Sequence, residues 1–236
     1  MKAFFSDAVE YQIIKSNPVT KRVYCKKGAE STERKPLTRE EQILFLQAMK
    51  GYLYYNPFAL ILQTGLRYSE LTGLQWNDVD FEKRIIHVRR TLRYDTKTQG
   101  WRWGSTKSKS GTRDIPMTEE AYNILENQRE QKNKVISLEF ANLVFVNRKG
   151  NPTLFSAYNG KLSEIADKLS IQKFSIHSLR HTFATRCIEG GMRPKTLQKI
   201  LGHSTLAITM DRYVHVVEDE QQKEMENIQS YLKVVG

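Results

Sequence analysis

Cysteine is scarce in this chain, and the spacings that bind zinc or form redox pairs are missing. The 236 residues include two cysteines, Cys25 and Cys187, which lie far apart and belong to no CxxC or zinc-ligand pattern. We therefore interpret both as idle or buried thiols rather than as metal ligands or disulfide partners. This usage requires no oxidising compartment, so we expect the protein to work in the cytoplasm.

Long apolar runs, repeats and low-complexity tracts are also absent from the sequence. No stretch approaches the roughly 20 apolar residues that span a bilayer, and the N-terminal residues lack the pattern of a signal peptide. The sequence therefore predicts neither a membrane span nor a secretion signal. It does contain 39% hydrophobic and 10% aromatic residues, enough to bury a core in one large domain or two small ones.

Positive charge is what the sequence has in excess. It holds 37 lysines and arginines against 26 aspartates and glutamates, a formal net charge of +11 at pH 7. A surplus of this size favours a polyanionic partner, and nucleic acid is the commonest one. An acidic membrane surface is the alternative, but the charge is dispersed and no strongly amphipathic basic helix is present. We therefore expect nucleic acid rather than a membrane as the partner.

Composition divides the chain into three parts. Residues 1–18 carry apolar side chains at helical spacing and close on Asn17-Pro18, which predicts one amphipathic helix. Residues 19–35 are basic and poor in apolar groups, which is typical of a linker, and a compact domain is expected over residues 36–236. One short helix cannot bury its own apolar face, so we expect residues 1–18 to belong to a domain that this chain lacks.

Within residues 36–236 the patterns alternate between helix and strand signals. Helix signals include the capping pair Thr38 and Glu41, and Gly65 at a helix end. Expected helices cover residues 38–50, 56–65, 69–74, 118–132, 155–169, 177–189, 194–201, 205–211 and 218–232, the last within a C-terminal tail of residues 218–236. Expected strands cover residues 85–94, 101–107, 112–116 and 143–146. These elements predict an α+β fold that is mainly α-helical, with a small antiparallel β-sheet.

Basic side chains crowd the predicted sheet. They are Arg84, Arg89, Arg90, Arg93, Lys97, Arg102, Lys107, Lys109 and Arg113. A solvated polar face would account for them, but lysine and arginine also neutralise DNA phosphates and release counterions. The candidate DNA contacts among them are Arg89, Arg90, Arg93, Lys109 and Arg113. Trp101, Trp103 and Tyr94 are interleaved with these charges, and we expect at least one of the tryptophans to pack on the core.

Three motifs place reactive side chains at short spacings. They read TGLRYSEL from Thr64, HSLRH from His177 and LGHS from Leu201, and a tyrosine follows ten residues after the last histidine. The side chains concerned are Arg67, Glu70, His177, Arg180, His203 and Tyr213. By itself each has an ordinary explanation, as a surface ion pair, a structural hydrogen bond or a packing residue. His177 and His181 stand four apart, but with no third ligand nearby in the sequence they predict no metal site.

Taken together, the motifs resemble those of the tyrosine recombinases, the integrases of phages and transposons. TGLRYSEL, HSLRHTFAT, LGHS and Tyr213 occur in that family's order and spacing, and the resemblance covers roughly residues 36–217. The segment STKSKSGTRDIP is similar to integrases of Gram-positive phages and conjugative transposons. The segment MKAFFSDAVEYQIIKSNPV resembles the last helix of the family's core-binding domain. The resemblance implies that residues 36–236 adopt the tyrosine recombinase catalytic fold.

The resemblance also implies a reaction, in which DNA strands are cut and rejoined through a covalent 3′-phosphotyrosine without metal, ATP or another cofactor. Tyr213 would be the nucleophile. Because an ordinary tyrosine has a pKa of about 10, its proton needs an acceptor, and His177 is the candidate. The guanidinium forks of Arg67 and Arg180 suit the non-bridging phosphate oxygens, on which negative charge accumulates.

The remaining roles follow from the same resemblance. His203 is expected to hydrogen-bond the scissile phosphate, and Glu70 to orient Arg67 or its helix. The departing 5′-oxygen needs a proton, which the family takes from a lysine on a β-hairpin. Lys107 best matches this position, and Lys109 is the alternative because the turn length differs among family members.

Two other functions remain as alternatives. A type IB topoisomerase shares this chemistry but relaxes DNA, and a non-catalytic regulator would use residues 190–213 as a helix-turn-helix. The histidine of LGHS and the integrase-like first helix favour a recombinase over a topoisomerase. A regulator would not require the arginines, histidines and tyrosine together.

The expected partners follow from the recombinase interpretation. We expect double-stranded DNA, and a homotetramer on DNA for a full-length protein, in the cytoplasm of a bacterial host. An accessory directionality factor is compatible with this function. The present chain is expected to be a catalytic fragment and a monomer by itself. Its tail, residues 218–236, would fold back on its own domain or dock on a neighbouring protomer.

Overall fold

A computed structural model describes residues 9–11, 13–16, 35–106, 111–131 and 138–207. The chain divides into two units, residues 1–34 and residues 35–236. In the first unit Val9 and Glu10 are helical, whereas residues 13–16 form bends. The helix predicted over residues 1–18 therefore does not extend through residues 13–16, in keeping with the marginal stability of short helices in water. The predicted linker falls almost entirely outside the described residues.

The first helices of the second unit begin and end where the sequence predicts. In α2 (Arg39–Met49), the side chain of Thr38 accepts from the Glu41 N–H, and the Glu41 carboxylate accepts from the Thr38 N–H at 2.8 Å. Helix α3 (Tyr55–Thr64) ends at Gly65, which adopts the left-handed conformation. A short helix, α4 (Tyr68–Thr72), begins three residues after Gly65.

The later helices also match their predicted ranges. They are α5 (Glu119–Glu130), α6 (Phe155–Leu169), α7 (Ile176–Glu189) and α8 (Pro194–Leu201). Residues 206 and 207 are helical, but the rest of the helices predicted at 205–211 and 218–232 lies outside the described residues. None of the helices in the described part of the chain has the length and apolar character needed to cross a lipid bilayer.

The strands form two antiparallel sheets rather than the single sheet that we expected. One sheet has the order β1 (Val79–Asp80), β2 (Ile85–Val88) and β5 (Arg113–Pro116), and the other pairs β3 (Arg90–Asp95) with β4 (Gly100–Ser105). The strand predicted over residues 85–94 is thus two strands, separated at Arg89. The two strands pack on different hydrophobic clusters. Ile86 of β2 belongs to the main cluster, whereas Leu92 of β3 packs with Phe140, Leu143 and Val146.

The strand predicted over residues 143–146 is wrong. Leu143 makes one isolated bridge with Gln75, and the Val144 N–H donates to Leu74 O at 2.9 Å. Residues 143–146 are all buried, so their apolar character reflects burial on several sides rather than a strand in a sheet. The 3-10 turn η3 (Leu138–Phe140) precedes this segment in the sequence, and the 3-10 turn η1 (Trp76–Asp78) lies beside it in space.

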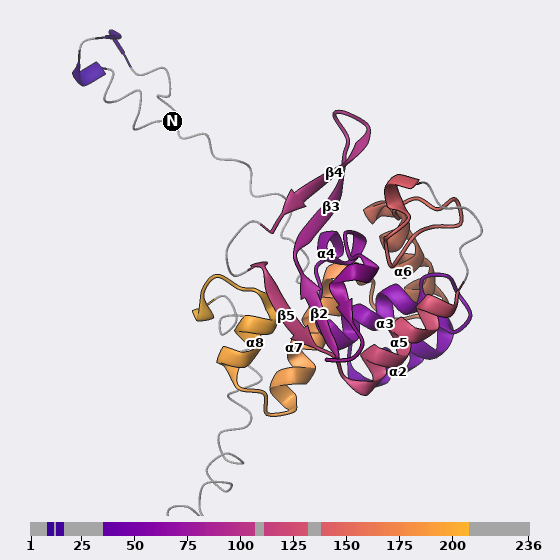
Figure 1. Cartoon of the computed structure of the whole chain (residues 1–236). Helices are drawn as coiled ribbons and strands as arrows, with labels where there is room; N and C mark the ends of the chain where they lie inside the picture. Colours follow the sequence, from indigo (N-terminus) through magenta and orange to yellow (C-terminus); the bar gives the residue numbers. More distant parts are fainter. Residues whose placement is uncertain (1–8, 12, 17–34, 107–110, 132–137, 208–236) are drawn as a thin grey trace, which may run out of the picture. The chain divides into compact units, whose positions relative to one another are not determined.

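The main core lies between the helices and the β1-β2-β5 sheet. Helix α3 is at its centre and packs against both α5 and α7 (Figure 1). Its fully buried side chains include Phe58, which contacts Phe45 and Tyr158 through tilted or edge-on ring arrangements. Helix α8 lies against β5 and α7, away from α6. The predicted α+β class, mainly helical with small antiparallel sheets, is confirmed.

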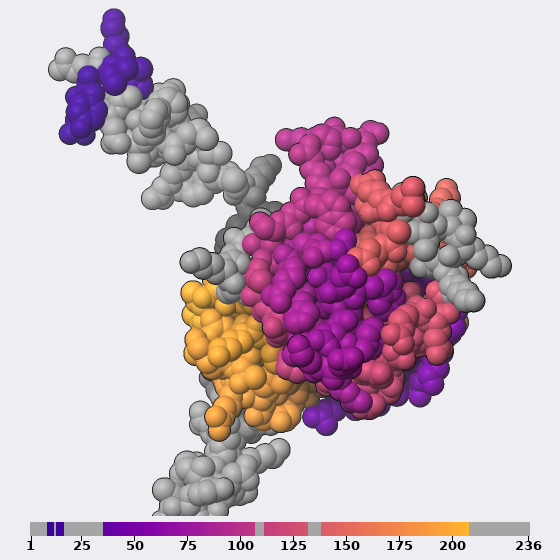
Figure 2. All heavy atoms as spheres, viewed as in Figure 1, coloured from indigo at the N-terminus to yellow at the C-terminus, as the bar shows by residue number. Residues whose placement is uncertain are grey.

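The β3-β4 ribbon projects from the surface of the second unit (Figure 2). Its base packs on the cluster around Leu92, where Trp101 is partly buried. Trp103, which pairs with Leu92 in the ribbon, is 41% exposed. The expectation that at least one tryptophan packs on the core is therefore met by Trp101.

Candidate active site

The C-terminal end of α8 is where the predicted site residues come together. Helix ends leave carbonyl groups without helical partners and carry a partial negative charge. Here three consecutive carbonyls each accept a hydrogen bond from one arginine of a different element. Arg113 of β5 donates to Ile200 O, Arg180 of α7 donates to Leu201 O, and Arg67 before α4 donates to Gly202 O.

Arg67 is fixed by its place at the start of α4. It is the N-cap residue in an extended conformation, and its N–H donates to Glu70 Oε2 at 2.9 Å. Its Nη1 donates to Glu70 Oε1 at 2.7 Å, and its Nη2 donates to Gly202 O at 3.1 Å. The side chain is 32% exposed, so a ligand can reach the guanidinium.

Arg180 is held more deeply, at 5% exposure. Its Nη1 donates to Gly65 O and its Nη2 donates to Leu201 O at 2.7 Å. Gly65 has a φ of 64°, and a Cβ atom at this position would lie 2.5 Å from Cδ1 of Phe183. A glycine is therefore required for the TGLR segment to approach α7 closely enough for this hydrogen bond.

His177 lies on the helix that carries Arg180, and His203 follows the helix end that both arginines contact. His177 is on α7, one turn before Arg180, and its ring makes an edge-on contact with that of His181. His203 directly follows the left-handed Gly202 and is 9% exposed. A reciprocal pair of hydrogen bonds holds its backbone: the His203 N–H donates to Gln198 O at 3.1 Å, and Gln198 Nε2 donates to His203 O at 3.2 Å.

Glu70 and Arg113 form a buried ion pair behind Arg67. Their side chains are 2% and 6% exposed, and Arg113 Nη2 lies 2.9 Å from Glu70 Oε2. Burial raises the pKa of Glu70, but hydrogen bonds and charge from Arg113, with the charge of Arg67, outweigh it and lower the pKa to about 2. Glu70 is therefore an anion that holds two arginines.

Arg113, which we predicted as a DNA contact on the basic face of the sheet, is buried in the structure. Along β5, Arg113 and Ile115 are buried while Asp114 and Pro116 are exposed. Side chains alternate between the two faces of a strand, so the inward Ile115 puts Arg113 on the inner face as well. The alternation of Arg113 with Ile115 was visible in the sequence, but we grouped Arg113 with the basic residues around it.

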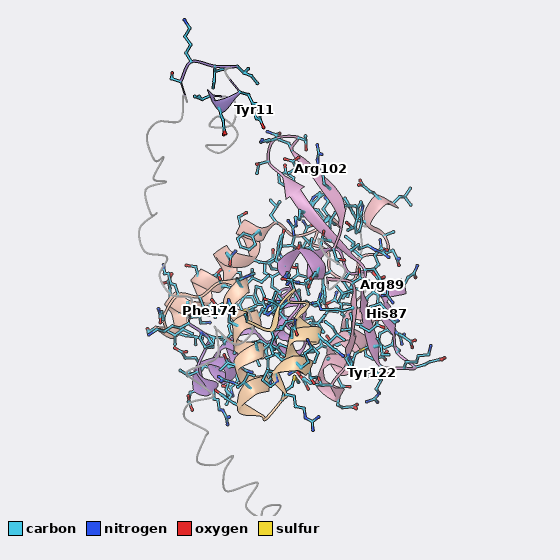
Figure 3. All side chains as sticks on the ribbon, turned by 90° about the vertical axis from the view of Figure 1, so that its left-hand side faces the viewer. Tyr11, His87, Arg89, Arg102, Tyr122 and Phe174 are labelled. Carbon is cyan, nitrogen blue, oxygen red and sulfur yellow. The ribbon has the colours of Figure 1, made fainter. Side chains whose placement is uncertain are left out.

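The other described DNA-contact candidates lie nearer the surface. Arg89 is half exposed, and its Nη2 lies 3.3 Å from Asp114 Oδ1. Arg90 pairs with Asp78 at 3.1 Å, and Arg93 Nη2 donates to Ser69 Oγ at 3.4 Å. Arg89 lies on the body of the unit beside His87, whereas Arg102 lies far along the ribbon (Figure 3).

Three predicted site residues, Lys107, Lys109 and Tyr213, lie outside the described residues. The roles assigned to them stay predictions. Among the residues that are described, no three histidine, cysteine, aspartate or glutamate side chains gather as metal ligands. The described side chains instead present two fixed guanidinium groups with a histidine beside them, an arrangement that can hold an anion such as a phosphate.

Comparison with known proteins matches both the motifs and the fold. Residues 35–220 match the model of the phage integrase family. The transposase of transposon Tn916 from Enterococcus faecalis is 34% identical over 242 residues, which cover 97% of this chain and 59% of that protein. A XerC-like tyrosine recombinase from Caldanaerobacter subterraneus subsp. tengcongensis is 30% identical, over 97% of this chain and 63% of that protein. The chain thus spans about three fifths of the length of these relatives.

Solved structures agree with the sequence matches. The Tn1549 transposon integrase in complex with a circular intermediate DNA superposes with a TM-score of 0.80 at 32% identity, over 96% of this chain and 76% of that one. XerA recombinase superposes with a TM-score of 0.63 at 25% identity, over 80% of this chain and 64% of that one. The family match extends over most of the sequence, and relatives at this identity share the same fold. The chain therefore belongs to the phage integrase family.

Proposed function

We propose that this protein is a site-specific DNA recombinase that cuts and rejoins double-stranded DNA through Tyr213. The observation that carries the proposal is the meeting of Arg67, Arg180 and His203, from three separate motifs, at the end of α8. Attack on a phosphodiester builds negative charge on the non-bridging oxygens. Preorganised guanidinium groups stabilise that charge in the transition state.

The proposed reaction balances without an external energy source. The hydroxyl oxygen of Tyr213 attacks phosphorus, the bond from phosphorus to the tyrosine oxygen forms, and the bond to the 5′-oxygen breaks. The tyrosine proton passes to His177, and the 5′-oxygen takes a proton from Lys107, with Lys109 as the alternative donor. One phosphoester bond replaces another, so attack by a 5′-hydroxyl reverses the step and rejoins the strand.

The wider partners belong to the same proposal. The complexes of the Tn1549 integrase with DNA support double-stranded DNA as the substrate here. We propose that a homotetramer assembles on two DNA sites, with room for an accessory directionality factor, in the cytoplasm of a bacterial host. In this organisation residues 36–236 are the catalytic domain. Residues 19–35 are a linker, and residues 1–18, which are not helical over 13–16, are the end of a core-binding domain.

The basic ribbon and sheet give the DNA a surface to follow. Arg89 directly precedes β3, Arg90 and Arg93 lie on it, and all three are at least partly exposed. Arg93 and Arg102 also line a shallow groove on the ribbon with the aromatic rings of Tyr94 and Trp103. Phosphate contacts of this kind position a duplex without reading its sequence.

A nicked suicide substrate tests the proposal. Cleavage on such DNA releases a short fragment and traps the covalent intermediate, which survives SDS electrophoresis. We expect the chain to form this adduct and Tyr213→Phe to form none. Tyr52→Phe, which removes the same hydroxyl from an exposed surface tyrosine, is the matched control and should react at the wild-type rate. An adduct with Tyr213→Phe would exclude Tyr213 as the nucleophile.

A substrate with sulfur in place of the leaving 5′-oxygen identifies the proton donor. A thiolate leaves without protonation, so it rescues a variant that has lost the general acid. We expect Lys107→Ala to be slow on the normal substrate and nearly normal on the sulfur substrate. Rescue of Lys109→Ala instead would assign the role to Lys109.

A further inference from the structure

We propose that Arg113 is a positioning residue of this site, acting through Glu70 on Arg67 and through Ile200 on the turn that carries His203. The inference rests on the proposed strand-transfer function, and it gives Arg113 a part in it that does not involve contact with DNA.

Arg113 acts on Arg67 through a shared carboxylate. Its Nη1 and Nη2 lie 3.0 and 2.9 Å from Glu70 Oε1 and Oε2, so the guanidinium binds the carboxylate with both prongs of its fork. The same two oxygens accept from the side chain and the backbone N–H of Arg67. Glu70 therefore cannot shift or rotate without breaking contacts to both arginines.

Arg113 also holds the far side of the site. Its Nε donates to Ile200 O in the last turn of α8, two residues before Gly202 O, which accepts from Arg67. The Arg113 guanidinium thus connects α4 and α8, the same two elements that Arg67 contacts. Loss of this connection would allow the Gly202-His203 turn to move relative to Arg67.

A third contact reaches the base of the β4-β5 connection. Arg113 Nη1 also lies 3.1 Å from Gly111 O. A Cβ atom on Gly111 would lie 2.6 Å from Thr106 Cβ, and the hydroxyls of Thr106 and Thr112 are 2.7 Å apart. Thr106, Gly111 and Thr112 therefore lie close together, and Arg113 ties them to Glu70.

No other side chain can replace these contacts at once. A lysine keeps the charge but has a single ammonium on a flexible stem, so it cannot bind both carboxylate oxygens and Ile200 O in one geometry. A glutamine is uncharged, so it leaves Glu70 as a buried anion with one cationic partner fewer. In both variants the expected defect is misplacement of Arg67, which shares the Glu70 carboxylate with Arg113, and of His203, which lies three residues after Ile200.

Glu70 provides a readout that a purely structural role would not move. Among the described residues, the charged groups that bind Glu70 are Arg67, which precedes α4, and Arg113 of β5. The small gap behind Glu70 is lined by the titratable or charged side chains of Asp78, His87, Arg89 and Arg90. The Arg113 hydrogen bonds and charge are the strongest influences that lower the Glu70 pKa against burial. Removing them raises this pKa, so the acidic limb of the cleavage rate should move to higher pH.

The experiment compares Arg113→Gln and Arg113→Lys with the wild-type chain. Single-turnover cleavage is measured at saturating suicide DNA, and non-covalent binding is measured in a Tyr213→Phe background. A misplacement of about 1 Å at a reacting group can cost about a hundredfold in rate. We expect such a loss in cleavage for Arg113→Gln and a smaller one for Arg113→Lys, with the dissociation constant changed by less than about threefold. If Arg113→Gln does not fold, Arg113→Lys carries the test.

Coupling to Glu70 is tested by a double-mutant cycle. If Arg113 works through Glu70, Arg113→Gln should slow cleavage much less in a Glu70→Gln background, and the shift of the acidic limb should vanish there. Arg129→Gln removes an exposed arginine paired with Glu126 on α5, and is the matched control with an unchanged rate. Thermal unfolding of each variant reports the folded fraction.

Three results would overturn the inference. They are a wild-type cleavage rate for Arg113→Gln, equal losses in DNA binding and cleavage, and fully additive effects with Glu70→Gln. Its failure differs from failure of the proposed function, because in the latter case the wild-type chain itself would form no covalent adduct.

Discussion

At the scale of single residues, Gly65 is where backbone conformation and packing make the strictest demand. Its φ is 64°, and a Cβ atom would lie 2.5 Å from Phe183 and 2.8 Å from Leu201. We predict that Gly65→Ala destabilises the fold by about 2 kcal/mol or more, from backbone strain and overpacking, and abolishes adduct formation. Urea unfolding measures the loss. Gly160→Ala, inside α6 with nothing near its Cβ position, should be neutral or stabilising by about 0.5–1 kcal/mol.

Glu70 links stability to pH. Its pKa is lowered in the folded state from 4.5 to about 2, so its contribution is present above the unfolded pKa and is lost as the pH falls toward and through 2. We predict that the free energy of unfolding of the wild-type chain declines between about pH 5 and pH 3, and that Glu70→Gln declines less over this range. Glu130→Gln, at an exposed position on α5, should follow the wild-type curve. An identical pH dependence for Glu70→Gln would contradict this reading of the ion pair.

Much of the site could be predicted from the sequence at this scale. The motifs fix which side chains carry charge, and the structure brings Arg67, Arg180 and His203 to one helix end. The motifs do not reveal the carbonyl groups at the end of α8 that accept from the arginines, or Arg113 as the buried partner of Glu70. Arg113 was assigned to the surface because its charge resembles that of its neighbours, whereas its alternation with Ile115 places it inside.

At the scale of elements, α7 ties the site to the beginning of the second unit. The buried hydroxyl of Thr182 accepts from the Leu37 N–H at 2.9 Å, and Arg186 Nη2 donates to Leu37 O at 2.7 Å. These contacts lie on the same helix as His177 and Arg180. The segment that leads into the domain is thereby fixed to the helix that carries two of the proposed catalytic groups.

The Thr182 contact can be tested by a near-isosteric change. Thr182→Val keeps the shape but leaves the buried Leu37 N–H without its acceptor, which costs about 1–3 kcal/mol. We predict a loss of stability in this range by urea unfolding. Thr196→Val makes the same change on the exposed face of α8 and should alter stability by less than about 0.5 kcal/mol. Equal effects of the two substitutions would show that the hydrogen bond to Leu37 contributes nothing specific.

Helices could be predicted from the sequence more closely than strands. Caps such as Thr38 and Gly65 are local signals, so they fix helix ends without knowledge of the fold. The division of residues 85–95 into β2 and β3 depends on two separate cores, and residues 143–146 are apolar because they are buried among several elements. These features arise from tertiary packing, which periodicity alone does not encode.

At the scale of the whole molecule, we expect the net charge of +11 to govern the proposed encounter with DNA. Binding should weaken steeply with salt, because each phosphate neutralised by the protein releases counterions. We predict that Arg93→Gln weakens binding to all sequences alike and reduces the slope of log K against log salt by about 1. Arg113→Gln should leave this slope unchanged, since its side chain is buried. A reduced slope for Arg113→Gln would return that residue to the DNA-contact surface.

A nucleophilic Tyr213 becomes covalently joined to a DNA 3′-phosphate, so the residue that carries the DNA can be identified chemically. The trapped adduct is digested with nuclease and protease, and the peptide that retains a nucleotide is sequenced by mass spectrometry. We predict a single modified residue, Tyr213, within the segment DRYVHVVEDE. A nucleotide on any other residue, or no nucleotide on any peptide from an active preparation, would contradict it.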